Sequence, residues 1–213
     1  MSSEVVSDVF WTHPDSVKLL NAFHIVLLMD NIYKTNKYRL PLLEIVGVIS
    51  TGLILSVAFV VLSNEREYNF VWALQKLKGL LLMVDHHEVI VCDRDLALMN
   101  AISIVFPEFH NLLCRFHINK NVKARCKMLV NTTKARDVIM EAWENIIDST
   151  NVRLFEDCVK HFEPVCEPWS LFVEYVKKTW LILHKEKFVK VWIDNFMHLG
   201  NLTCKMFCCL ILV

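Results

Sequence analysis

Glycine and proline are scarce in this chain, and neither sign of charge predominates. Its 213 residues include four glycines and five prolines, which excludes collagen-like and linker-rich proteins. Lys plus Arg equals Asp plus Glu at 23 each, so a globally basic nucleic-acid binder is excluded, although a local basic patch is not. Hydrophobic residues make up 54% of the chain, which excludes intrinsic disorder. The chain is therefore globular and has the length of one ordinary domain.

Two further patterns are missing. No two of the eight cysteines have the Cys-x-x-Cys spacing, so the common structural zinc patterns are absent. The N-terminal MSSEVVSDVF is acidic and does not have the basic-then-apolar order of a secretory signal. We therefore expect that the protein is not secreted and that its cysteines are reduced thiols.

A long uncharged run extends from Ile45 to Asn64, between Glu44 and Glu65. Its length would suit a membrane-spanning helix, and the mean hydropathy of the chain is +0.37. The run is nevertheless rich in β-branched residues, and Ser50-Thr51-Gly52 at its middle is typical of a turn. We predict two buried strands here, and a small membrane-associated protein is the alternative.

The remaining periodicity predicts an α/β protein. A short helix near Pro14 precedes a strand over 23–30, the two strands of the uncharged run, a helix over 65–82 and a strand over 89–93. A helix over 95–105 and an extended segment over 110–117 follow. The rest is predicted to be helical, over 118–128, 135–147, 154–162, 171–183 and 187–193, with interruptions at Pro164 and Pro168. Three sequential strands that can form a meander, followed by a crossover helix and a fourth strand, predict a mixed sheet.

Asp30 and Asp93 each close a short apolar strand. Ligand crevices form at strand ends in open α/β sheets, and two carboxylates there could hold divalent cations for phosphoryl chemistry. Mg²⁺ prefers such oxygen ligands. The alternative is structural: Asp30 would start a turn, and Asp93 would cap the following helix.

Two other groups of residues indicate a functional site less clearly than the two aspartates do. Cys114 and His117 supply two ligands at most, and the nearby His110 and Cys126 have irregular spacing, so we predict packing and no zinc site. A basic cluster follows on a predicted helix. It could contact DNA phosphates, or it could be a solvated face. The cluster comprises Lys120, Lys123, Arg125 and Lys127.

Three segments, in this order, resemble the Mutator-like element (MULE) transposase domain of plants: MDNIYKTNKYRLPLLEIVGV, VIVCDRDLALMNAI and FPEFHNLLCRFHINKNVKARCK. The likeness is to the domesticated branch related to the far-red-impaired-response proteins, and it extends from about Phe10 to Asn201. It implies a ribonuclease-H-like α/β core over 23–117 after a lead-in over 1–22. A helical insertion region over 118–201 and an aberrant apolar tail over 202–213 complete the implied organisation.

The resemblance also implies chemistry. Asp30 and Asp93 match two aspartates that bind Mg²⁺ or Mn²⁺ for DNA cleavage and strand transfer, and Cys114 and His117 match a Cys-x-x-His motif. DNA is the implied partner and the nucleus the implied location. No Asp or Glu follows Asp194, so the third catalytic acid that the family carries there is missing.

We therefore expect a truncated, degenerate or domesticated transposase core without strand-transfer activity. Such a core could contact DNA weakly, bind protein partners or self-associate, because a sheet without its neighbours leaves apolar surface uncovered. An active transposase that receives its third acid from elsewhere is the alternative.

Overall fold

The computed structural model describes residues 6–22, 25–32, 36–49, 52–82, 89–200 and 202. It divides the chain into two compact units. Of the described residues, the sheet unit comprises those up to Cys114 together with those from Met197 onward, and the helical unit comprises Arg115–Phe196. The predicted apolar tail lies outside the described residues, apart from Leu202.

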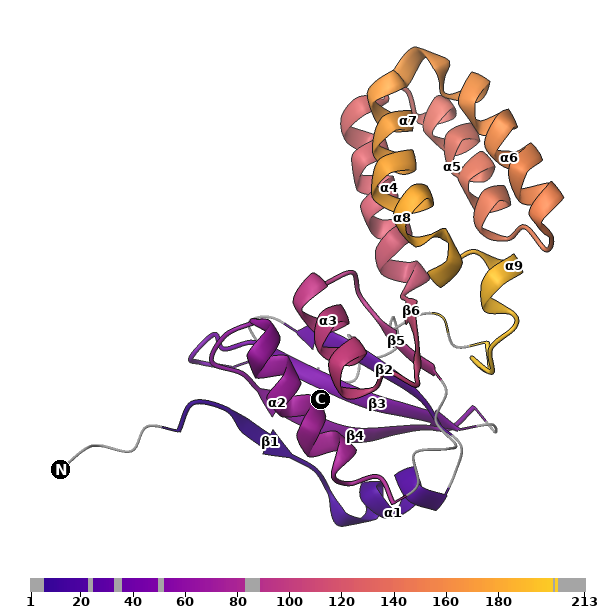
Figure 1. Cartoon of the computed structure of the whole chain (residues 1–213). Helices are drawn as coiled ribbons and strands as arrows, with labels where there is room; N and C mark the ends of the chain where they lie inside the picture. The colour runs from indigo at the N-terminus through magenta and orange to yellow at the C-terminus, as the bar shows by residue number, and fades with distance from the viewer. Residues whose placement is uncertain are drawn as a thin grey trace. The chain divides into compact units, whose positions relative to one another are not determined.

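The sheet unit is built on a six-stranded mixed sheet in the order β1-β4-β3-β2-β5-β6 (Figure 1). The strands β2, β3 and β4 form an antiparallel meander, and β5 and β6 run parallel to β2. These findings confirm the predicted α/β class, the mixed sheet and the meander. The strand bounds are β1 (Val9–Trp11), β2 (Ile25–Ile32), β3 (Leu42–Ile49), β4 (Ile54–Val61), β5 (Val89–Cys92) and β6 (His110–Leu113).

The uncharged run forms β3 and β4, as its β-branched residues predict. Gly52 has a φ of +79°, which suits a glycine in the connection between the two strands, while Ser50 and Thr51 lie outside the described residues. Within the described part of the chain, no helix is long and apolar enough to cross a membrane. The strand β3 begins earlier than predicted, at Leu42, and therefore includes Glu44.

The edge strand β1 was not predicted, because three residues are too few to show a period. It pairs with β4 over Val9–Trp11. A bulge lies in β4, where Val57 is the residue without a partner in β3. The carbonyl of Val57 accepts a hydrogen bond of 2.6 Å from the Thr12 hydroxyl. The bulge thus supplies an acceptor that fixes the end of β1.

Three helices complete the described part of the sheet unit: α1 (Pro14–Ala22), α2 (Glu67–Lys78) and α3 (Leu96–Val105). In Figure 1, α2 and α3 lie beside one another over one face of the sheet. Both helices bury an apolar stripe that includes Phe70, Leu74, Leu98 and Ile102. This packing holds the sheet, and with it the ends of β2 and β5, in a fixed arrangement.

The helical unit begins with three helices of similar length: α4 (Arg115–Leu129), α5 (Thr133–Ile147) and α6 (Val152–Val165). A continuous helical stretch follows, composed of α7 (Ser170–Val176), a π-helical turn over Lys177–Leu181 and α8 (Ile182–His184), before the short α9 (Lys190–Ile193). Trp143 and Trp180 are buried in its core.

Two boundaries in this region differ from the sequence prediction. The extended segment predicted over 110–117 ends at Leu113, because α4 already begins at Arg115. Pro164 does not interrupt α6 but lies in its last turn.

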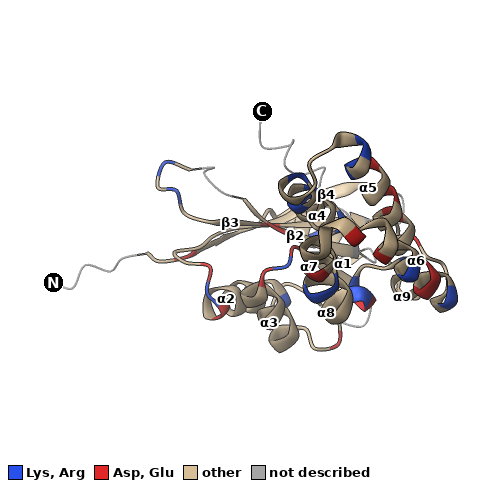
Figure 2. Cartoon of the chain, turned by 90° about the horizontal axis from the view of Figure 1, so that it is seen from above, with Lys and Arg blue, Asp and Glu red and all other residues tan. Residues whose placement is uncertain are grey.

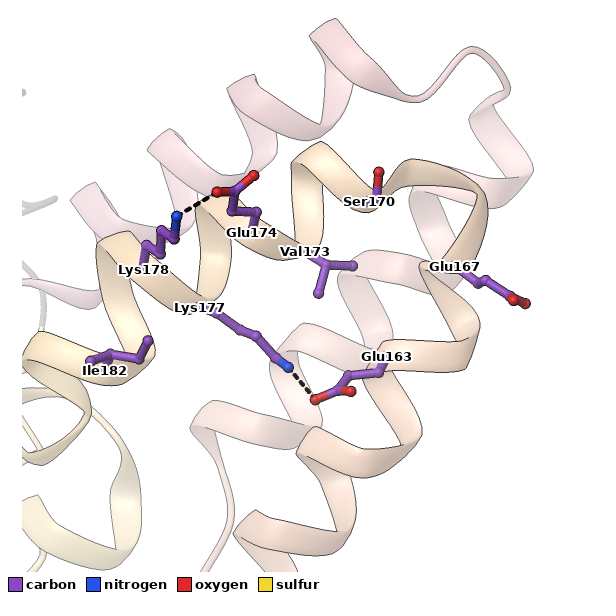
Figure 3. A pocket seen from close by; sticks show the side chains of 8 residues that line it. All are labelled: Glu163, Glu167, Ser170, Val173, Glu174, Lys177, Lys178 and Ile182. Atoms are coloured by element: carbon purple, nitrogen blue, oxygen red, sulfur yellow. Dashed lines mark hydrogen bonds and ion pairs between the residues drawn. The ribbon is translucent and has the colours of Figure 1, made fainter.

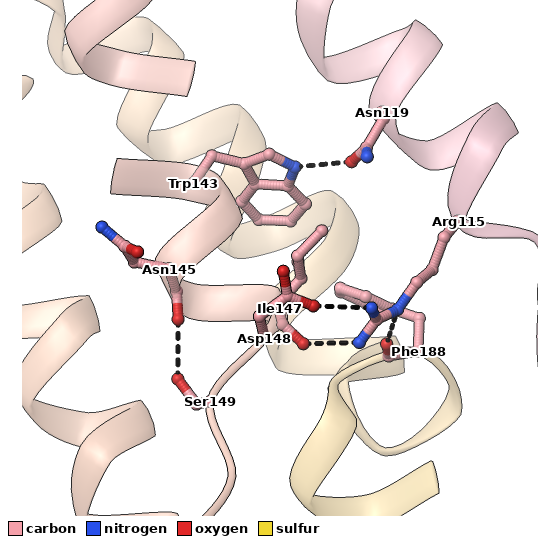
Figure 4. A network of polar contacts seen from close by, with 8 residues as sticks. All are labelled: Arg115, Asn119, Trp143, Asn145, Ile147, Asp148, Ser149 and Phe188. Carbon is pink, nitrogen blue, oxygen red and sulfur yellow. Dashed lines mark hydrogen bonds and ion pairs between the residues drawn. The ribbon is translucent and has the colours of Figure 1, made fainter. Parts of the chain in front are cut away.

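Arg115 joins three parts of the helical unit (Figure 4). Its Nε donates to the Phe188 carbonyl at 2.8 Å, and its Nη2 donates to the Ile147 carbonyl at 2.6 Å. Its Nη1 contacts Oδ1 of Asp148 at 2.7 Å. The guanidinium therefore ties the start of α4 to the end of α5 and to the segment before α9.

Candidate functional site

Asp30 and Asp93 occupy corresponding positions on neighbouring strands. The parallel register of β2 and β5 pairs Met29 with Cys92, and each aspartate is the next residue along its strand. Asp30 is buried, with 6% of its surface exposed, and Asp93 is half-buried. The fold thus brings to adjacent backbone positions two carboxylates that are 63 residues apart in the sequence.

The structural alternatives for these two aspartates do not hold. Asp30 does not start a turn, because β2 continues to Ile32. Asp93 is not the cap of α3, because Asp95 has that role: its Oδ1 accepts a hydrogen bond of 3.0 Å from the Leu98 amide. Oδ1 of Asp93 instead accepts a hydrogen bond of 2.6 Å from the next backbone amide, that of Arg94.

A third carboxyl group, which the sequence analysis did not single out, lies beside Asp30. Glu44 of β3 is directly opposite Asp30 in the antiparallel register and has only 3% of its surface exposed. Residues directly opposite each other in such a pair lie on the same face of the sheet. Burial, and then the charge of Asp30, raise the pKa of Glu44 from 4.5 to about 7.

The carboxyls of Asp30 and Glu44 could supply two ligands to a divalent cation, but not a complete set. Oε2 of Glu44 is buried and has no hydrogen-bond partner, so the pair of carboxyls presents an unused oxygen ligand. Among the described residues, however, no three His, Cys, Asp or Glu side chains are arranged to hold a metal ion. Mg²⁺ is commonly bound by one or two carboxylates and retains several waters, which two adjacent carboxyls satisfy.

The Cys-x-x-His motif is divided between the two units. Cys114 ends the sheet unit, is fully buried and donates its amide to the Cys92 carbonyl at 2.8 Å. His117 lies in the first turn of α4, with its ring 5.4 Å from that of Phe116. Cys114 thus extends the pairing of β6 with β5 by one residue beyond the strand.

The basic cluster lies on α4, but its members differ in solvent exposure. Lys120, Lys123 and Lys127 are exposed, and their i, i+3, i+7 spacing places them on one face of the helix. Arg125 is half-buried, and its guanidinium lies over the Tyr175 ring at 5.5 Å. The three lysines, which we call the lysine face, therefore form an exposed stripe that does not include Arg125. On α5 and α6, by contrast, basic and acidic residues are interspersed (Figure 2).

The helical unit also has a shallow groove lined by α6, α7 and the turn that follows (Figure 3). Its charged residues are largely paired: Lys177 with Glu163, and Lys178 with Glu174 at 2.5 Å. This pairing neutralises most of the charge in the groove, which gives it little to attract a charged ligand.

Comparison with known proteins identifies the part of the chain that holds these carboxyls. Residues 26–121 match the family of the MULE transposase domain. This part of the chain is similar to the MULE transposase domain. The matched segment extends from β2 into α4 and includes Asp30, Glu44 and Asp93.

Proteins similar to this chain occur in the plant Arabidopsis thaliana. The chain is 28% identical over 165 residues to protein FAR1-RELATED SEQUENCE 5 of Arabidopsis thaliana, covering 70% of this chain and 20% of the relative. It is 27% identical over 210 residues to FAR1-RELATED SEQUENCE 6 of the same plant, covering 90% and 29%. The chain thus spans less than a third of the length of these relatives.

A fungal protein is also similar. The chain is 30% identical over 125 residues to the PKS-NRPS hybrid synthetase cheA of Chaetomium globosum, covering 58% of this chain and 3% of the synthetase. The likeness concerns one small segment of that protein.

Proposed function

We propose that this chain is a domesticated, ribonuclease-H-like MULE core that associates with DNA and binds Mg²⁺ or Mn²⁺ but does not transfer DNA strands. The observation that carries the proposal is the adjacency of Asp30 and Asp93 on β2 and β5. Carboxylates on neighbouring strands can hold the divalent cations that metal-dependent phosphoryl chemistry uses. The likeness to FAR1-related proteins supports the domesticated branch.

Each aspartate has a separate task in this proposal. Asp30 would be the fixed ligand, because it lies inside β2 and is paired with Glu44 of β3. Asp93, just beyond β5, would be the adjustable ligand. A bound cation would supply positive charge to a DNA phosphate. Among the described residues, no three His, Cys, Asp or Glu side chains are arranged to hold a metal ion, so the two aspartates have no further carboxylate that would hold two cations in register for in-line displacement.

The absence of strand cleavage is tested on supercoiled plasmid DNA with Mn²⁺ or Mg²⁺. We expect the wild-type chain to nick the plasmid no faster than Asp30→Asn or Asp93→Asn, because two carboxylates alone do not align the attacking and leaving oxygens. Gel electrophoresis of the relaxed product measures the rate. Nicking by the wild type that both substitutions abolish would contradict the proposal and would favour an active transposase.

DNA association is assigned in this proposal to the lysine face of α4. Contacts between lysines and phosphates are independent of sequence and weaken with salt through counterion release. The zero net charge of the chain does not oppose such contacts, because a local stripe suffices. We propose a nuclear location for the same reason, since DNA is found there.

Neutralising the lysine face is expected to weaken DNA binding about tenfold or more and to lower the salt slope by about one per lysine. The variant replaces Lys120, Lys123 and Lys127 with Gln. A matched control replaces three lysines whose charges are already paired with a nearby acid on the same helix, namely Lys18, Lys160 and Lys178. Fluorescence anisotropy of a labelled duplex at several salt concentrations measures both quantities. Equal losses in the two variants would refute a specific role for α4.

A further inference from the structure

Glu44 is a buried acid that the two-aspartate site does not explain. It lies opposite Asp30 in the β2–β3 register, and only 3% of its surface is exposed. Among the described residues, no Lys or Arg forms an ion pair with Glu44, and its Oε2 has no hydrogen-bond partner. An acid buried in this way is costly unless a positive charge or a proton compensates it.

The position of Glu44 completes a row across the sheet. The antiparallel register places Glu44 beside Asp30, and the parallel register places Asp93 at the next position on the other side of Asp30. The row therefore crosses β3, β2 and β5, with Asp30 in the middle. Side chains directly opposite each other have Cβ atoms about 5 Å apart, a separation across which two carboxylates can bind one small cation.

We propose that Glu44 is a ligand of the divalent cation at Asp30, so that β3 contributes a carboxylate to the site beside that of β2. This inference rests on the proposed cation-binding function. Its independent support is the orphaned Oε2, a buried oxygen that has no partner on the chain itself. A cation bound there would compensate the buried carboxylate of Glu44, which has no ion-pair partner among the described residues.

Mn²⁺ binding to the full chain tests the inference, measured by the loss of the electron paramagnetic resonance signal of free Mn²⁺. We expect Glu44→Gln to weaken binding at least tenfold and Asp30→Asn to weaken it similarly. Glu44→Asp, which keeps the carboxylate, is expected to retain part of the affinity. Glu108→Gln is the control, because Glu108 is exposed in the same unit and pairs with Lys78 at 3.3 Å. It is expected to bind Mn²⁺ within twofold of the wild type.

The thermal midpoint of the metal-free protein separates a ligand from a structural residue. As a ligand, Glu44 leaves an uncompensated acid in the metal-free state, so Glu44→Gln is expected to unfold at the same or a higher temperature than the wild type. A lower midpoint with unchanged Mn²⁺ affinity would overturn the inference. If Asp30→Asn loses Mn²⁺ while Glu44→Gln binds normally, the inference fails but the proposed function stands. If the wild type binds no Mn²⁺, both fail.

Discussion

At pH 8, without divalent cations, Glu44→Gln is expected to make the sheet unit more stable than the wild type by up to about 3 kcal/mol, and at pH 4 this difference disappears. In the folded chain, burial and Asp30 raise the pKa of Glu44 to about 7, against 4.5 for an ordinary glutamate. The unfolded chain therefore loses this proton at a lower pH than the folded chain. The stability that Glu44 contributes is complete below pH 4.5 and is lost as the pH rises through 7.

Glutamine keeps the shape of Glu44 and has no charge, so it removes this pH dependence. The two units need not unfold together, so the stability of the sheet unit has to be measured separately. Hydrogen exchange of the β2 and β3 backbone amides gives the free energy of opening for these strands. Glu108→Gln is again the control and should leave the pH profile of the wild type intact. A difference between Glu44→Gln and wild type that stays constant from pH 4 to pH 8 would contradict the prediction.

Arg115→Ala is expected to destabilise the helical unit by about 3 kcal/mol. The substitution removes three hydrogen bonds and leaves the Ile147 and Phe188 carbonyls without their donor. The Arg115 side chain is only 15% exposed, so water replaces these bonds poorly. The partner carboxylate of Asp148 is 61% exposed, and Asp148→Asn alone is therefore expected to cost less than about 1 kcal/mol.

Tryptophan fluorescence during urea unfolding measures this loss, because Trp143 is buried in the helical unit. Arg115→Lys tests the geometry: it keeps the charge but lacks the planar fork, and we expect it to recover less than half of the lost stability. Arg153→Ala, at an exposed position on α6, is the control and should stay within about 0.5 kcal/mol of the wild type. If Arg115→Ala unfolds like this control, the network in Figure 4 does not support the unit.

The strands of the sheet unit could largely be predicted from the sequence, because a run of β-branched residues encodes local structure. The uncharged run became β3 and β4 for this reason, with Gly52 in the connection. The three-residue β1 could not be predicted, because its stability comes from pairing with β4 about 50 residues away. The start of α4 was placed too late because Cys114 offers no capping side chain to mark it.

The candidate site was predicted only in part. Asp30 and Asp93 stand out because each follows an apolar run, which is a local signal. Glu44 has no such signal: in the sequence it is only the charged residue that precedes the uncharged run. Its pairing with Asp30 depends on the register of β2 and β3, which the residues between the strands set. Arg115 was missed for a similar reason, since its partners are 32, 33 and 73 residues away.

The division of the chain into two units has a kinetic consequence. The helical unit is one uninterrupted segment, Arg115–Phe196, whose helices pack mainly against neighbours in sequence, as α5 does against α6. The sheet unit must instead join β1 to β4 and β2 to β5 across long intervening stretches. Chains rich in local contacts fold faster than those that depend on distant strand pairing. The helical unit can therefore reach its native packing while the carboxyl row, which needs three strands in register, is still unformed.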